Sequence, residues 1–146
     1  MSIFKSMEIS ASALTAQRLR LDIISSNIAN VDTTRTKKGE PYRRKMVVFQ
    51  EMNESSDFNE ILNDKINYNG KGVRVAAIVE DQRPFKIVYD PAHPDADEKG
   101  YVRMPNVNIV EEMVDMISAT RSYEANVTAI NSTKSMISKA LEIGKG

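Results

Sequence analysis

The segment PNVNIVEEMVDMISATRSYEANVTAINSTKSMISKALEIGKG, residues 105–146, decides the fold. No proline follows Pro105 and no glycine lies between Pro105 and Gly144, so nothing in between interrupts a helix. Apolar side chains recur at alternating spacings of four and three residues, the pattern of a long helix with one narrow apolar stripe. The stripe, broken only by Thr120 and Lys134, consists of Ile109, Met113, Met116, Tyr123, Val127, Ile130, Ile137 and Leu141. A helix of about 50 Å with such a stripe needs a partner.

The predicted ends of this helix carry their own signals. Asn108 followed by Glu111 resembles a capping box, and Glu111, Glu112 and Asp115 place negative charge near the positive end of the helix dipole. Gly144 is then available as a left-handed stop.

Residues 1–30 predict a second long helix. Its stripe is thinner, because polar side chains alternate with the apolar ones, and the helix is expected to close at 27–30, where Asn tolerates a left-handed conformation. The stripe consists of Met7, Leu14, Leu21 and Ile28, with Ile3 and Ile24 beside it. We expect the two terminal helices to pair as a coiled coil.

The middle of the chain contains every proline and most of the glycines, between residues 39 and 105. Runs of β-branched and aromatic residues predict strands at 42–51, 73–81, 85–89 and 100–103, with a hairpin-like connection at 81–84. The predicted fold class is α+β: long terminal helices paired as a coiled coil and a small central β-rich unit. The predicted domains are a helix at 1–34, a β-rich unit at 35–104 with a loop at 52–70, and a helix at 105–146.

Composition excludes several function classes. Basic and acidic residues number 20 each, so the net charge favours neither nucleic acid nor an anionic membrane surface. There is no cysteine, and no apolar run is long enough to span a bilayer. Residues 11–13 mimic a signal-peptide cleavage site, but no apolar run precedes them, so we expect no cleaved signal. The sequence predicts no cofactor, no nucleic-acid partner and no membrane insertion.

One histidine lies among carboxylates in the segment DPAHPDAD, residues 90–97. The segment reads either as a metal site or as a turn, stiffened by proline, whose Asp side chains bond to their own backbone. Two prolines and the absence of calcium-loop spacing favour the turn. No nucleophile and base pair can be named, so the chain is not expected to be an enzyme; a metal-dependent hydrolase at His93 stays as a remote alternative.

Charge is unevenly distributed in the middle of the chain. A basic cluster spans residues 35–45, and residues 51–64 are acidic without any Lys or Arg. Opposite patches suit head-to-tail contact between copies or with partners. The alternative is a monomeric adaptor, in which the two helices form an antiparallel hairpin and the basic segment recruits a partner.

Two terminal motifs resemble the flagellar rod, hook and related axial protein family. Residues 26–33, SNIANVDT, are similar to that family's Asn-x-Ala-Asn-x-x-Thr signature, and residues 122–126, SYEAN, are similar to its C-terminal motif. Proximal-rod members are matched best, through VYDP running into HPDAD at 88–97, GYV at 100–102 and PNVN at 105–108. The matched positions are Asn27, Ala29, Asn30, Thr33, His93, Pro94, Asp95, Ala96, Asp97, Gly100, Tyr101, Pro105, Asn106, Tyr123, Ala125 and Asn126.

The resemblance implies a structural subunit of the proximal rod of the bacterial flagellar basal body. It implies a periplasmic location in that rod, export through the flagellar export apparatus without a cleaved signal, and a tube that transmits torque and leaves an export channel. The implied partners are copies of the chain and other rod proteins. The apolar stripes of both helices are then the expected assembly interface.

Overall fold

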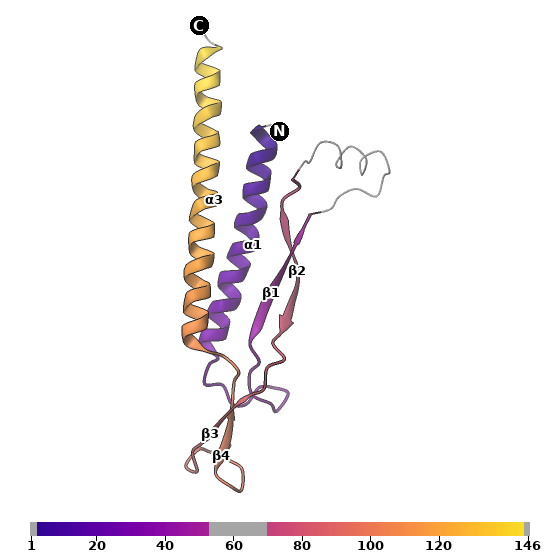
Figure 1. The fold of residues 1–146 in the computed structure, drawn as a ribbon, viewed down its shortest axis with the longest axis vertical. Coiled ribbons are helices and arrows are strands. Elements are labelled where there is room, and N and C mark those ends of the chain that lie inside the picture. Colours follow the sequence, from indigo (N-terminus) through magenta and orange to yellow (C-terminus); the bar gives the residue numbers. More distant parts are fainter. Residues whose placement is uncertain (1–2, 53–69, 145–146) are drawn as a thin grey trace, which may run out of the picture.

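A computed structural model describes residues 3–52 and 70–144 of the chain (Figure 1). The elements, in order, are α1 (Ile3–Ala29), β1 (Lys45–Glu51), β2 (Val73–Glu80), β3 (Lys86–Tyr89), β4 (Tyr101–Met104) and α3 (Ile109–Ile143). The predicted α+β class, with long helices at both ends and a small central β region, is confirmed.

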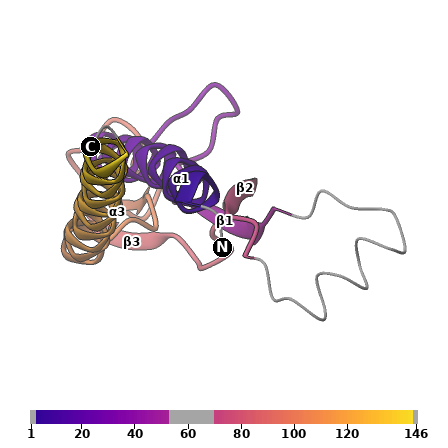
Figure 2. The same ribbon diagram turned by 90° about the horizontal axis from the view of Figure 1, so that it is seen from above.

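Helices α1 and α3 pack side by side and run in opposite directions (Figures 1 and 2). Helix α3 has 35 residues and α1 has 27, so α3 is longer by about 12 Å at 1.5 Å per residue. Small side chains are prominent among the buried residues, namely Ser10 and Ala16 of α1 and Ala119 and Thr133 of α3. Small residues let the two backbones approach closely. Neither described helix is long and apolar enough to cross a membrane.

The helix ends differ in detail from the prediction. Asn108 is the N-cap of α3, but its side chain accepts from the Val110 amide, and the Glu111 carboxylate turns instead toward arginines. The capping box is therefore incomplete. Gly144 caps α3 in a right-handed conformation with φ −75°, so the predicted left-handed stop is wrong. The left-handed Asn predicted for the end of α1 is also wrong, because every positive φ among the described residues belongs to a glycine.

The four strands form two separate antiparallel ribbons, β1–β2 and β3–β4. The predicted strands are all present, but the predicted hairpin at 81–84 is wrong because β2 pairs with β1 and not with β3. Residues 81–84 instead join the two ribbons. Asp81 turns the chain there: its amide donates to the Arg44 carbonyl, and its carboxylate accepts from the Arg83 amide at 2.9 Å.

Ribbon β1–β2 packs along α1, on the side of that helix away from α3 (Figure 2). Ser12 of α1 donates to the Ile9 carbonyl and accepts from the Val73 amide at 3.1 Å, which ties the start of β2 to the helix. Gly72, with φ +85°, allows this approach: a Cβ there would lie 2.6 Å from the Ser12 Oγ. Most of the predicted loop at 52–70 lies outside the described residues.

Ribbon β3–β4 lies beyond the base of the helix pair, where α1 ends and α3 begins (Figure 1). Tyr89 and Tyr101 stack edge to face with ring centroids 5.3 Å apart, and Val102 is almost fully buried. The chain then passes through buried Pro105 into α3. This order places the polar residues that precede β1 and follow β2 next to the first turns of α3.

Candidate functional site: a buried polar cluster and an exposed helix face

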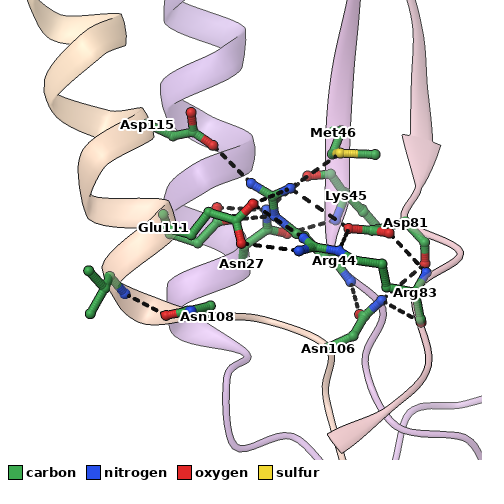
Figure 3. Close-up of polar contacts among 12 residues, drawn as sticks. Asn27, Arg44, Lys45, Met46, Asp81, Arg83, Asn106, Asn108, Glu111 and Asp115 are labelled. Atoms are coloured by element: carbon green, nitrogen blue, oxygen red, sulfur yellow. Dashed lines mark hydrogen bonds and ion pairs between the residues drawn. The ribbon is translucent and has the colours of Figure 1, made fainter.

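A cluster of polar side chains lies at the base of the helix pair, where α1, α3 and ribbon β1–β2 meet (Figure 3). Asn27, which is 1% exposed, lies at its centre. Its amide group donates to the Lys45 carbonyl at 2.8 Å and to the Glu112 carboxylate at 2.9 Å. Its oxygen accepts from the Lys45 amide at 2.9 Å and from the Tyr42 hydroxyl at 3.0 Å. One side chain thus joins α1 to the edge of β1 and to the start of α3.

Arg44 supplies the positive charge of the cluster. Its Nε donates to the fully buried Glu112 carboxylate, and its Nη2 lies 2.8 Å from Asp115. Burial of the guanidinium by itself would lower the pKa of Arg44, but the hydrogen bond and charge of Glu112, with the neighbouring carboxylates, raise it above its ordinary value. Asp115 also bonds to Arg20 of α1 at 3.1 Å. The cluster therefore connects the two helices through opposite charges as well as through Asn27.

The outer part of the cluster fixes the junction between the two ribbons. Asn106 accepts from the Arg44 amide at 2.8 Å and donates to the carbonyls of Asp81 and Arg83. Burial alone would raise the pKa of Asp81, but hydrogen bonds from the Arg83 amide and guanidinium, with the charges of both arginines, hold it below its ordinary value. The Arg83 Nε lies 2.6 Å from the Asp81 carboxylate. The backbone at 81–84 is thus held by side chains from both sides.

The sequence predicts only part of this cluster. Asn27 and Asn106 are motif positions, whereas Arg44 belongs to a basic segment expected on the surface and Glu112 to the acidic residues expected at the start of a helix. Arg44 is only 6% exposed and Glu112 is 0% exposed. The available signal was the i, i+3 spacing of Glu112 and Asp115, which places two carboxylates on one side of α3.

A second feature is an apolar strip on α3 that the rest of the described chain leaves uncovered. Among the described elements, α3 contacts only α1. The face that meets α1 includes Glu112, and buried Ala119 and Thr133 repeat it at multiples of seven residues. The strip lies away from that face and consists of Ile109, Val110, Met113, Val114 and Ile117, which are 45–69% exposed. Water-exposed apolar residues gathered in this way mark an interaction surface.

The predicted stripe residues divide by exposure. Ile3, Ile109, Met113 and Leu141 are exposed, and Ile24 is buried. The half-buried members are Met7, Leu14, Leu21, Ile28, Met116, Tyr123, Val127, Ile130 and Ile137. Residues predicted from one stripe thus lie partly within the chain and partly on its surface.

Residues 90–97 form a turn held by their own side chains. Asp90 accepts from the Ala92 amide at 3.1 Å, and Asp97 accepts from the Lys99 and Tyr101 amides, both at 2.9 Å. The expected bonding of Asp side chains to their own backbone is present at both positions. Within the described residues, no group of three His, Cys, Asp or Glu side chains is arranged to hold a metal ion.

Two family models match the chain. "Flagella basal body rod protein" matches residues 7–37, and "Flagellar basal body rod FlgEFG protein C-terminal" matches residues 98–143. The flagellar basal-body rod protein FlgC of Bacillus subtilis is 57% identical over 99% of this chain and its own full length. FlgC of Borreliella burgdorferi is 54% identical over both full lengths, and FlgC of Escherichia coli O157:H7 is 46% identical over 99% of this chain and its own full length.

The chain belongs to the FlgC family of flagellar basal-body rod proteins. In this FlgC-family chain, the N-terminal motif residues have distinct places. Asn27 centres the cluster, Ala29 ends α1, and Asn30 donates to the Ser26 carbonyl at 2.8 Å. The Thr33 hydroxyl donates to the Asn30 side-chain oxygen at 3.2 Å, just beyond the end of α1.

The remaining FlgC-family motif positions shape the turn and α3. Asp95 accepts from the Thr34 hydroxyl at 2.7 Å, and the His93 Nδ1 accepts from the Asp95 amide at 3.1 Å. Gly100 has φ +79°, and a Cβ there would lie 3.0 Å from the Tyr89 ring. Asn126 donates to the Ser122 carbonyl, within α3.

Proposed function

We propose that this chain is a structural subunit of the bacterial flagellar rod, built into a tube through its two terminal helices. The observation that carries the proposal is full-length similarity to FlgC proteins, at 57% and 54% identity to two of them. The exposed strip on the first turns of α3 supports it, because a structural subunit needs an apolar surface for its neighbours.

The proposal divides the chain by role. The helices at 1–34 and 105–146 would form the wall of the rod, and residues 35–104 would project from it. The stripe residues on both helices, such as Leu21 and Ile130, remain the proposed assembly interface. Head-to-tail contacts that do not close generate helical tubes, and such a tube leaves room for an export channel.

The remaining assignments follow from the same proposal. The partners are copies of the chain and other rod proteins, and the flagellar export apparatus during secretion. The location is the periplasmic rod of the basal body, reached without a cleaved signal. The chain acts as a non-enzymatic, torque-transmitting part.

Met113→Asp tests the exposed strip directly. Met113 is 53% exposed, so the substitution should change the free energy of unfolding by no more than about 0.5 kcal/mol. A charge in an apolar contact between subunits should nevertheless block incorporation into the rod and abolish motility in a strain that lacks the native gene. Asn131→Asp, on the same helix at an exposed polar position, is the matched control and should assemble normally.

The alternative, a monomeric adaptor, has one observation in its favour: α1 and α3 pair within a single chain. Normal motility and normal rod content with Met113→Asp would favour it over the rod subunit. If circular dichroism shows that Met113→Asp is unfolded, the test is repeated with Val114→Asp, at a position that is 61% exposed, so that unfolding is distinguished from failed assembly.

A further inference from the structure

Two arginines share one aromatic ring at the junction of the two ribbons. The Arg43 Cζ lies 4.3 Å from the centroid of the Phe85 ring, and the Arg103 Cζ lies 5.0 Å from it. Each guanidinium is attracted to the ring, but the two positive charges repel one another. We call Arg43, Phe85 and Arg103 the Phe85 patch.

The charges of the Phe85 patch are not neutralised within the described residues. Neither Arg43 nor Arg103 forms an ion pair there, whereas the neighbouring Arg44 and Arg83 each bond to carboxylates. Arg43 donates a long hydrogen bond of 3.4 Å to the Asp81 carbonyl. Two guanidinium groups at one ring, without a carboxylate, form a surface suited to one, because each can present paired N–H donors.

The surroundings of the patch limit what it would bind. The groove beside Arg43 is lined by Lys38 and Lys45, and also by Glu40 and Glu80. The positive charge is therefore concentrated at the ring and is not spread over a broad basic surface. Such a patch fits a short acidic peptide better than a long polyanion.

The chain itself contains an acidic peptide of this kind. Residues 51–64 carry Glu51, Glu54, Asp57, Glu60 and Asp64, with no Lys or Arg among them. Its five carboxylates make this segment an electrostatic complement of the patch.

Geometry favours the acidic segment of another copy. The segment leaves β1 at Glu51, and the patch lies just before Lys45, at the other end of that strand. At about 3.3 Å per residue this separation is roughly 25 Å, whereas Asp57 is only about 17 Å of extended chain beyond Met52. By length of extended chain, only Glu60 and Asp64 of the five carboxylates lie far enough along to reach the patch of their own chain, whereas the segment of another copy is free of that limit.

We propose that the Phe85 patch binds the acidic segment 51–64 of a neighbouring copy of the chain. The inference rests on the proposed function, because it names one contact between copies in the assembled rod. The contact is heterologous: the patch of one copy meets the acidic segment of the next, which leaves one unused segment and one unused patch at the two ends of a row of copies for further neighbours.

Fluorescence anisotropy of a labelled synthetic peptide, residues 51–64, titrated with the full chain at micromolar concentrations, tests the contact. We expect saturable binding that weakens at high salt. Arg43→Gln combined with Arg103→Gln should weaken it at least tenfold. The matched control, Arg121→Gln with Lys134→Gln, removes two exposed charges from α3 and should leave binding unchanged. Circular dichroism checks that both variants are folded.

Three results would overturn the inference: no binding by the unaltered chain, equal weakening by the control pair, or equal binding of a peptide of the same length in which Gln and Asn replace the five carboxylates. If the patch variant were unfolded, Arg103→Lys, which keeps the charge but loses the paired donors, would replace it and should still weaken binding. The measurement uses soluble chain, so a negative result leaves rod membership to the Met113→Asp experiment.

Discussion

Replacing Glu112 by alanine removes the carboxylate that holds the buried Arg44 and accepts from Asn27. Breaking a buried ion pair costs about 3–5 kcal/mol, because the remaining charge stays desolvated. Arg44 keeps Asp115 at 2.8 Å, which places the expected loss near the lower limit, at about 3 kcal/mol. For a chain of this size that corresponds to a melting temperature lower by roughly 6–12 °C.

Urea unfolding followed by far-ultraviolet circular dichroism measures this loss. Glu124→Ala is the control, because Glu124 is exposed on the same helix, and its effect should stay within about 0.5 kcal/mol. Removing both charges, with Glu112→Leu and Arg44→Met together, should recover much of the stability that Glu112→Ala loses. The reasoning is refuted if Glu112→Ala loses less than about 1 kcal/mol, or if the double variant loses the sum of its two single variants.

Two further perturbations test the junction and the helix contact. The pKa of Asp81 is depressed in the folded protein, so the stability that its carboxylate contributes is complete above about pH 4 and is lost as the pH falls through the folded pKa. Asp81→Asn should therefore reduce the dependence of the unfolding free energy on acid pH. An unchanged dependence would contradict this. Gly72→Ala and Gly39→Ala both place a side chain at positive φ, at about 1–2 kcal/mol each, but only the former meets Ser12. Gly72→Ala should cost about 1 kcal/mol more, through the hydrogen bond from Val73 to Ser12, and equal unfolding free energies would rule out the clash.

The helices and strands were predictable because their signals are local. Uninterrupted segments without Gly or Pro gave the helices, and β-branched runs gave the strands. The pairing of strands does not depend on local signals. The sequence at 81–84 resembles a hairpin turn, but Asp81 bonds to Arg44 and Arg83, and the segment joins the two ribbons instead. Tertiary contacts there outweighed the turn signal.

The cluster could be predicted only through its asparagines. Arg44 lies between two other basic residues, and Glu112 follows another acid, so each has the sequence context of a surface charge. Their burial depends on meeting one another across 68 positions of the chain, which no local pattern reveals. The face of α3 toward α1 includes Glu112, Ala119 and Thr133, which an apolar pattern cannot detect.

The placement of the cluster has a mechanical consequence. The buried ion pairs all lie where α1 ends and α3 begins, so they fix the angle between the two helices at that end, and α3 continues from there for about 50 Å. A change of one degree in this angle would displace the far tip of α3 by about 0.9 Å, given that length. Modest changes at Arg44 or Glu112 would therefore disturb contacts at the far end of α3 more than contacts near the cluster.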